Sequence, residues 1–549
     1  MPAFPQLSPL ESFLTTYKPI YPTIFEKFSR LDIKYIDKVE HRSQHNELLK
    51  NVFPYTISQK VAQFYQSNHE KTSTKPLRIG VLFSGGPAPG GHNVLAGLFD
   101  GMKQYSSESR LFGFLEGGIG LINQSFLEIQ KEMLNYYRNL GGFDFLGSAR
   151  KQLGTPETCA LILKNAMKIK LDGLVIVGGE GSNTGTAILA EYFAANHSPI
   201  TVVGIPKTID GDLRHELLEA SFGFDSASSF YATAIGNIAH DIVSTKKNYH
   251  FVKLMGRAAS HIILECALKT SPNIALIGEE AFQKNLSLQD LIKSITQMIL
   301  KRDKQGKHYG LILIPEGIIE FIPEVDCLVK EIMNLSMIGK IGFKEYLSEN
   351  SRKLLDLFPK KIEHQLLYDR DSYGQVWLSK IAVEKLFIHL VQQELQQHSM
   401  KEIFEPVSHF LGYEGRCCTP TPFDNTYCYA LGLTGVGLII HQLNGYLGSL
   451  THLHESPEKW QPTGIPLTAM IDMVNDKDGE PKPFISKYLT DTQGAPFKLF
   501  KDKERLCKEQ DLYNFPGPLQ LFKQDGSYEK PTLSESLKAE KSAKRNSAL

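Results

Sequence analysis

The chain has 549 residues, 42% of them hydrophobic and 22% charged, which is typical of a globular protein with two or three domains. The 60 Lys and Arg residues balance the 60 Asp and Glu residues. The net charge therefore does not attract nucleic acid or anionic membranes, and neither is an expected partner. Seven cysteines without CxxC spacing argue against a disulfide framework or zinc site and predict a cytoplasmic location. Neither a signal-peptide pattern nor an apolar run of about 20 residues occurs in the sequence.

The chain opens with a predicted helical N-terminal extension over residues 1–76, because residues 45–65 have helical apolar spacing, broken at Pro54. Residues 322–405 are charged and Leu-rich with helical period and predict a helical insertion. Residues 527–549 are polar and predict a mobile tail.

Between these segments, short apolar runs recur that end in glycine or polar residues. They are LRIGVLFSGG (77–86), LDGLVIVGGEG (171–181), ITVVGIPKTIDGD (200–212), HFVKLMG (250–256), NIALIGEE (273–280) and YGLILIPEG (309–317). Runs that are apolar on both faces are typical of buried parallel strands, and helical segments separate several of them. This alternation predicts an α/β fold with mainly parallel sheets, in which ligands bind beyond the carboxyl ends of the strands.

The first glycine-rich segment, SGGPAPGGHN, favours an anion site. Gly85 and Gly86 carry no Cβ, so their backbone N–H groups can approach a phosphate closely. Asn93 then begins a predicted helix, whose amino end attracts negative charge. The segment lacks the Lys of a P-loop and the spacing of a dinucleotide fingerprint, and a tight turn without a ligand is the alternative.

A second glycine-rich turn, GGEGSNTGTA (178–187), carries one carboxylate, Glu180. This carboxylate can contact a Mg²⁺ ion held mostly by water and phosphate, or it can be an ordinary solvated acid.

The segment GIPKTIDGDLR (204–214) is the most informative. If the strand stays extended, Thr208, Asp210 and Asp212 face one way, and Lys207 and Ile209 face the other. Two acids and a hydroxyl suit a hydroxyl substrate and a metal, and the lysine suits a phosphate. Lys207 and a metal would keep Asp210 ionised, as a general base requires. The alternative is an Asp-Gly turn with helix caps.

Three further segments that follow predicted strands carry charged residues: Met255-Gly256-Arg257, Glu316, and Tyr413 to Arg416. Arg257 can bind a phosphate with two parallel hydrogen bonds. Each of these segments alone is compatible with an ordinary surface turn. Only the occurrence of several such segments at strand ends favours a phosphoryl-transfer site.

In this order, SGGPAPGGHN, GGEGSNT, GIPKTIDGD, SFGFDSA, KLMGRAASH, PEG and GYEGR resemble the phosphofructokinase family, specifically its long pyrophosphate-dependent form. The resemblance implies two α/β domains and Mg²⁺-dependent, reversible phosphoryl transfer to the C1 hydroxyl of fructose 6-phosphate. It implies a donor-binding domain at 77–245, completed by part of 440–526, and a sugar-phosphate-binding domain at 246–321 and 406–439.

The resemblance also implies residue roles. Asp210 is the base, assisted by Lys207, Asp212 and Arg257, and Glu180 is at the metal position. Residues implied in donor binding are Gly85, Gly86, Gly181 and Lys207. Residues implied in sugar binding are Thr208, Ile209, Asp210, Lys247, Asn248, Met255, Gly256, Arg257, Glu316, Tyr413, Glu414, Gly415 and Arg416. Lys247 and Asn248 match a pair that the partner subunit lends, so at least a homodimer with shared active sites is expected.

Three positions depart from the family pattern. Glu180 stands where the family usually has Asp, and Asn248 stands where it has Tyr. Gly181 is the residue of ATP-using members, whereas Lys207 accompanies pyrophosphate use. Pyrophosphate is the favoured donor on overall architecture. The alternatives are an ATP-dependent phosphofructokinase and a weakly active regulatory subunit of a hetero-oligomer. A relation to GGDG-type kinases would rest on the GGEGS turn alone.

Overall fold

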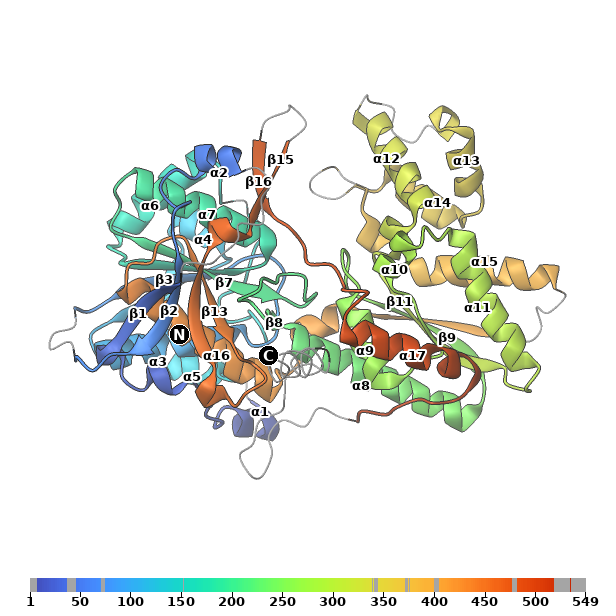
Figure 1. Cartoon of the computed structure of the whole chain (residues 1–549), viewed down its shortest axis with the longest axis horizontal. Helices are drawn as coiled ribbons and strands as arrows, with labels where there is room; N and C mark the ends of the chain where they lie inside the picture. Colours follow the sequence, from blue (N-terminus) through green and yellow to red (C-terminus); the bar gives the residue numbers. More distant parts are fainter. Residues whose placement is uncertain are drawn as a thin grey trace, which may run out of the picture. The chain divides into compact units, whose positions relative to one another are not determined.

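The computed structural model describes residues 7–36, 46–70, 75–151, 153–337, 339, 344–370, 374, 376–398, 404–475, 481–517 and 534. The chain divides into two compact units (Figure 1). Unit 1 comprises Met1–Ala227, Gly415–Lys487 and Gln520–Pro531, and unit 2 comprises Ser228–Glu414, Tyr488–Leu519 and Thr532–Leu549. Apart from Ser534, the predicted tail at 527–549 lies outside the described residues.

Unit 1 is built on a ten-stranded sheet, in the order β1-β2-β14-β13-β7-β6-β3-β4-β5 with β8 paired to β7. The strands are β1 (Leu31–Ile36), β2 (Val61–Gln66), β3 (Arg78–Phe83), β4 (Arg110–Phe114), β5 (Phe126–Glu128), β6 (Gly173–Gly178), β7 (Thr201–Thr208), β8 (Phe222–Gly223), β13 (Tyr446–Thr451) and β14 (Gln461–Pro466). The central strands β13, β7, β6, β3 and β4 are parallel. The flanking pairs β1–β2, β2–β14, β13–β14 and β4–β5 are antiparallel.

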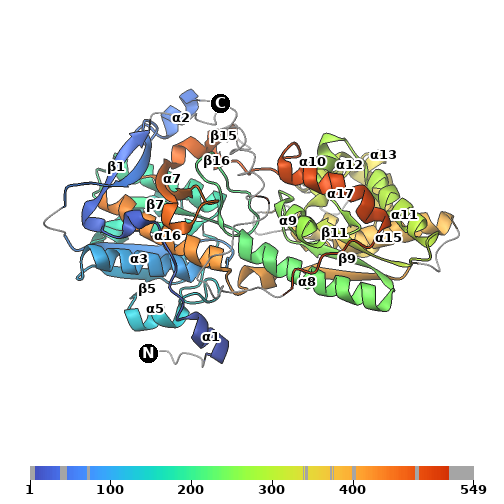
Figure 2. The same ribbon diagram turned by 60° about the horizontal axis from the view of Figure 1, so that its bottom comes forward.

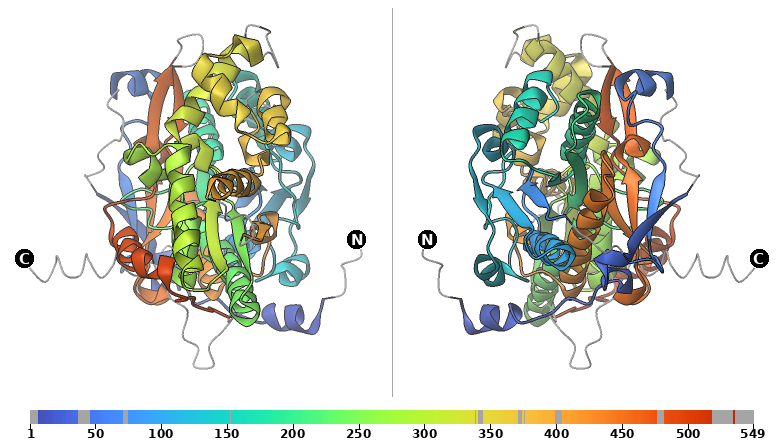
Figure 3. Two further views of the ribbon diagram at one scale, coloured as in Figure 1. Left: turned by 90° about the vertical axis from the view of Figure 1, so that its right-hand side faces the viewer. Right: turned by 90° about the vertical axis from the view of Figure 1, so that its left-hand side faces the viewer.

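Helices cover both faces of this sheet. A buried core joins one face to α4 (Gly118–Asn123), α6 (Pro156–Lys168) and α7 (Glu180–Ala195). On the other face, α3 (Gly91–Tyr105) and α16 (Pro422–Ile440) lie side by side (Figures 2 and 3). Their close approach requires glycine, since a Cβ at Gly97 would lie 2.0 Å from the Tyr429 carbonyl oxygen. The remaining unit 1 elements are α1 (Pro9–Leu14), α2 (Asn46–Val52), α5 (Lys131–Tyr137), β15 (Ile471–Asn475) and β16 (Pro481–Ile485).

Unit 2 has a four-stranded, all-parallel sheet in the order β10-β11-β9-β12. The strands are β9 (Asn248–Leu254), β10 (Ile274–Ala275), β11 (Tyr309–Pro315) and β12 (Pro406–Leu411). Its helices include α9 (His261–Thr270), α10 (Gly278–Gln283), α11 (Leu288–Asp303) and α17 (Ala495–Glu509), and most of α8 (Phe224–Thr245) belongs to it. The insertion consists of α12 (Pro323–Met337), α13 (Glu349–Asp356), α14 (Lys360–Tyr368) and α15 (Val383–Gln397), whose apolar side chains share one core with β9 and β11.

The predicted α/β fold with mainly parallel sheets is confirmed, but two details of the prediction are wrong. The N-terminal extension is not purely helical, because β1 and β2 form a hairpin and β2 joins the main sheet through β14. The domain boundaries also differ, since residues 415–439 belong to unit 1, where α16 packs against α3, and residues 228–245 and 488–519 belong to unit 2, where α17 packs against α9. Within the described residues, no helix has the length and apolarity of a membrane span.

Candidate functional site

Three parallel strands of unit 1 end side by side, and each end carries predicted site residues. β3 leads into Gly85 and Gly86, and β6 leads into Glu180 and Gly181, whereas β7 ends with Lys207 and Thr208 and leads into residues 209–212. The register pairs Phe83 with Val177 and Gly178 with Pro206, so the three ends are adjacent. We call Gly85, Gly86, Glu180, Gly181 and residues 207–212 the unit 1 edge.

The first glycine turn is flanked by two cationic side chains. Gly85 has a φ of 84°, a conformation that glycine adopts without strain. A Cβ at Gly85 would lie 3.5 Å from Lys207 Nζ, and one at Gly86 would lie 3.4 Å from Arg416 Cζ. The Ser148 hydroxyl donates to the Gly85 carbonyl oxygen over 2.9 Å and holds the turn in place. Bare backbone between an ammonium and a guanidinium is suited to a phosphate group.

Lys207 is buried, with only 7% of its surface exposed. Burial lowers the pKa of Lys207 to about 8. The carboxylates of Glu180, Asp210 and Asp212 counteract part of this effect on its pKa, while the Arg416 guanidinium adds to it. The lysine therefore shares its surroundings with all three acids of the edge.

The predicted alternation of side chains after β7 is wrong. The strand ends at Thr208, and the chain turns at Gly211, which has a φ of 71°. Within the turn, the Thr208 hydroxyl donates to Asp212 Oδ1 over 3.0 Å and accepts from the Asp210 N–H, also over 3.0 Å. The acids and Lys207 therefore meet around one turn instead of on opposite faces of a strand.

The pKa of Asp212 is strongly shifted. Burial and, after it, the negative charges of Asp210 and Glu180 raise the pKa of Asp212 to about 7. The Lys487 ammonium and the Thr208 hydroxyl lower the pKa of Asp212.

Glu180 begins α7 and faces the same ammonium. Lys487 Nζ lies 3.7 Å from Glu180 Oε1 and 3.9 Å from Asp212 Oδ2, so both carboxylates are directed at one cation. This donor set fits Mg²⁺, which proteins often bind through one or two carboxylates with phosphate and water as the other ligands. In the described part of the chain, no three His, Cys, Asp or Glu side chains are grouped as a complete metal site. Next to Glu180, a Cβ at Gly181 would meet no atom within 4 Å.

Unit 2 also brings strand ends together, and we call residues 255–257, 316 and 413–414 the unit 2 edge. Leu254 at the end of β9 pairs with Pro315 of β11 and with Leu411 of β12. The residues that follow, Met255 to Arg257, Glu316, and Tyr413 with Glu414, are therefore adjacent.

Close packing fixes two of these ends. A Cβ at Gly317 would lie 1.7 Å from the Arg257 carbonyl oxygen, so only glycine fits there. Arg257 Nε donates to Glu320 Oε1 over 3.0 Å, and 45% of the arginine side chain is exposed. Glu316 is buried, whereas Tyr413 is 66% exposed.

Lys247 and Asn248 lie at the other end of β9. The strand runs from Asn248 to Leu254, about 20 Å at the usual rise per residue, so this pair does not join Met255 to Arg257 within the chain. Asn248 has a φ of 67°, which asparagine tolerates better than the tyrosine of the family pattern.

Sequence reasoning grouped Arg416 with the sugar-binding residues, whereas the structure places it in unit 1, beside Gly86. Two residues beside the unit 1 edge were missed altogether. Ala149 forms a bridge with Ser84, which brings Arg150 next to the first glycine turn, and Lys487 faces Glu180 and Asp212. The SAR tripeptide after a glycine was a weak signal for Arg150, and no local motif marks Lys487.

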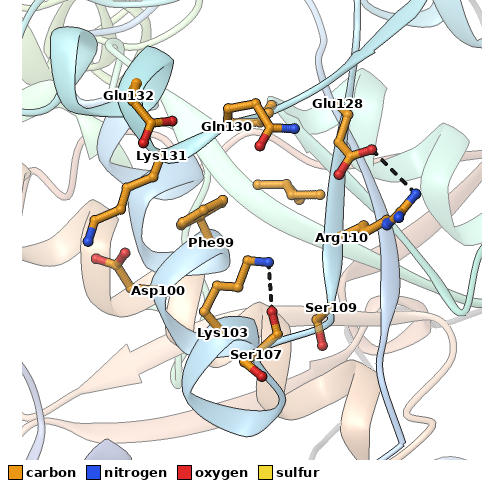
Figure 4. Close-up of a pocket in the computed structure, with 12 residues that line it drawn as sticks. Phe99, Asp100, Lys103, Ser107, Ser109, Arg110, Glu128, Gln130, Lys131 and Glu132 are labelled. Carbon is orange, nitrogen blue, oxygen red and sulfur yellow. Dashed lines mark hydrogen bonds and ion pairs between the residues drawn. The ribbon is translucent and has the colours of Figure 1, made fainter.

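A cavity of about 430 Å³ lies elsewhere on unit 1, between the end of α3 and the starts of β4 and α5 (Figure 4). Within it, Lys103 donates to the Ser107 carbonyl oxygen over 2.9 Å, and Arg110 pairs with Glu128 at 3.7 Å. Arg110 begins β4, so the cavity is at the opposite end of the strands from the unit 1 edge and contains none of the predicted residues.

Comparisons with known proteins agree with these features. The family model described as phosphofructokinase matches residues 78–439. A protein of Entamoeba histolytica named pyrophosphate–fructose 6-phosphate 1-phosphotransferase is 39% identical over 96% of this chain and 98% of its own. Subunit beta 2 of the same-named Arabidopsis thaliana enzyme is 43% identical, over 88% of this chain and 86% of its own.

A solved structure shares the fold. A pyrophosphate-dependent phosphofructokinase from Nitrosospira multiformis is 14% identical, with a TM-score of 0.53 over 83% of this chain and 97% of that one. Together with the family model and the two relatives of about 40% identity, this fold makes the assignment plain. The chain belongs to the phosphofructokinase family.

Proposed function

We propose that the protein is a pyrophosphate-dependent phosphofructokinase, which transfers a phosphoryl group reversibly from pyrophosphate to the C1 hydroxyl of fructose 6-phosphate. The names of the relatives across nearly the whole chain support this proposal. The observation that carries it is the unit 1 edge, where Lys207 and Arg416 flank a bare glycine turn beside three carboxylates.

In this proposal, the unit 1 edge binds the donor. The backbone of Gly85 and Gly86 approaches the phosphates, with Lys207 and Arg416 neutralising their charge. Asp210, fixed by the bond from its N–H to Thr208, accepts the proton of the sugar hydroxyl. Glu180 and Asp212 would hold Mg²⁺, which would supply charge neutralisation on the phosphoryl oxygens when bound.

The unit 2 edge binds the sugar phosphate in the same proposal. Arg257 would exchange its bond to Glu320 for a phosphate oxygen, and it would also stabilise charge on the transferring group. Thr208, Ile209 and Asp210 form the loop that orients the sugar hydroxyl, and Gly415 links the two edges in sequence. The other sugar-binding residues in this proposal are Met255, Gly256, Glu316, Tyr413 and Glu414.

We also propose an assembly of at least two copies in the cytoplasm. Lys247 and Asn248 would serve the site of a partner, which explains their place at the amino end of β9. Seven free thiols fit a reducing compartment.

A two-donor assay tests the proposal. Purified protein is incubated with Mg²⁺, fructose 6-phosphate and either pyrophosphate or ATP, and fructose 1,6-bisphosphate is measured. Product with pyrophosphate is expected, and its absence would overturn the donor assignment. ATP is the second candidate donor, because the open space beside Gly181 leaves room for a larger ligand.

A further inference from the structure

Lys487 lies beside the candidate site, and its ammonium group can still donate hydrogen bonds. Its Nζ faces Glu180 and Asp212 at 3.7 and 3.9 Å, both beyond hydrogen-bonding range. Among the described residues the ammonium donates no hydrogen bond, and 36% of the side chain is exposed. All three of its N–H groups are thus available to another acceptor.

The position of Lys487 is built into unit 1. It follows β16, which lies against α7 (Figure 1). The N–H of Ile485, two residues earlier, donates to Thr184 Oγ1 in α7 over 3.1 Å, and the Ile485 side chain is buried. Ser486 donates to Asp472 on β15, so the hairpin fixes the backbone that carries the lysine.

The positions of the charged side chains around the unit 1 edge indicate a role for Lys487. Lys207 and Arg416 flank the glycine turn, whereas Lys487 is the cation that lies within 4 Å of both Glu180 and Asp212 in the described part of the chain. A divalent cation bound to these acids would repel the ammonium from them. A diphosphate arriving with that cation would offer the displaced ammonium new anionic oxygens within reach.

We propose that Lys487 is a donor-binding residue that neutralises Glu180 and Asp212 in the metal-free protein and donates to the diphosphate oxygens when Mg²⁺ and donor bind. This inference rests on the proposed function, because it needs a diphosphate at the unit 1 edge. It differs from an ordinary surface ion pair in predicting opposite effects on metal and on donor.

The chain offers a matched control for this proposal. Lys482 lies on β16, five residues before Lys487, and is exposed. Its side chain makes no ion pair or hydrogen bond with the described residues. Removing its charge changes the net charge of the hairpin as much as removing that of Lys487.

Calorimetry and metal binding test the proposal with the full chain. We expect Lys487→Met to weaken pyrophosphate binding in the presence of Mg²⁺ by about tenfold or more, the effect of a lost charged hydrogen bond. Lys487→Arg should keep most of the affinity, and Lys482→Met should match the unaltered protein. With Mn²⁺ alone and no donor, Lys487→Met should bind the metal more tightly, because the competing cation is gone.

Two results would overturn the inference: pyrophosphate affinity of Lys487→Met within twofold of the unaltered protein, or Mn²⁺ affinity that does not rise. Lys487→Gln serves as a second variant if the methionine variant does not fold. Failure of the unaltered protein to bind pyrophosphate would overturn the proposed function itself, and is therefore a distinguishable outcome.

Discussion

The buried ammonium of Lys207 predicts an unusual pH dependence of donor binding. An ordinary lysine stays charged to about pH 10, but burial lowers the pKa of Lys207 to about 8. With that pKa, about nine-tenths of the side chains are charged at pH 7 and about one-tenth at pH 9. An anionic donor favours the charged form of Lys207. The affinity for the donor is therefore highest well below pH 8 and falls as the pH rises through 8.

If only the charged form binds, pyrophosphate affinity falls about tenfold between pH 7 and pH 9, or about 1.4 kcal/mol. Calorimetric titration with Mg²⁺ and pyrophosphate across this range measures the fall. Lys207→Arg is the matched control, since a guanidinium stays charged throughout, while ionisation of the ligand contributes equally to both profiles.

The difference between the two profiles isolates Lys207. We expect the unaltered protein to lose about tenfold more affinity than Lys207→Arg over this range. Parallel profiles, or a loss that begins only near pH 10, would refute the argument that burial controls this charge.

Four further changes have defined outcomes. Asp210→Ser should lower turnover by about 10²-fold or more while fructose 6-phosphate still binds, and unchanged steady-state turnover would exclude Asp210 as the base. Gly181→Asp should keep the melting temperature, since its Cβ meets no atom within 4 Å, and should reduce any use of ATP; an unaltered ATP rate would show that this position does not select the donor. Gly317→Ala places a Cβ 1.7 Å from the Arg257 carbonyl oxygen and should cost about 2 kcal/mol or more in urea denaturation, so an unshifted midpoint would contradict the packing described for the unit 2 edge. Chelation by EDTA should abolish turnover and added Mg²⁺ restore it, whereas activity that survives chelation would argue against a metal at Glu180 and Asp212.

The strands that sequence reasoning found share one property. β3, β6, β7, β9 and β11 are buried on both faces, so continuous apolar runs mark them. Two of the strands that were not predicted, β14 and β12, lack that signal. β14 contains two prolines, and β12 is an edge strand with alternating exposure.

Assignment of segments to units needed tertiary information. α16 is apolar around its whole circumference, so its sequence does not reveal which helix or sheet it packs against. Glycines at 97 and 432 allow its contact with α3, but they resemble ordinary helix glycines until both backbones are placed.

The site residues divide in the same way. Residues at strand ends were predictable, because the carboxyl ends of neighbouring parallel strands lie at the same edge of a sheet and bring the glycine-rich segments that follow them together. The turn after Thr208 was not, because hydrogen bonds to its hydroxyl override the alternation of an extended strand. Lys487 comes from a distant hairpin, and only folding brings it to Glu180.

Transfer of isotope between the two substrates tests the central claim most directly. With ³²P-labelled pyrophosphate, fructose 6-phosphate and Mg²⁺, we expect label in fructose 1,6-bisphosphate, and with labelled phosphate and fructose 1,6-bisphosphate, we expect label in pyrophosphate. Label found only in inorganic phosphate, or transferred only from ATP, would contradict a pyrophosphate-dependent phosphoryl transfer.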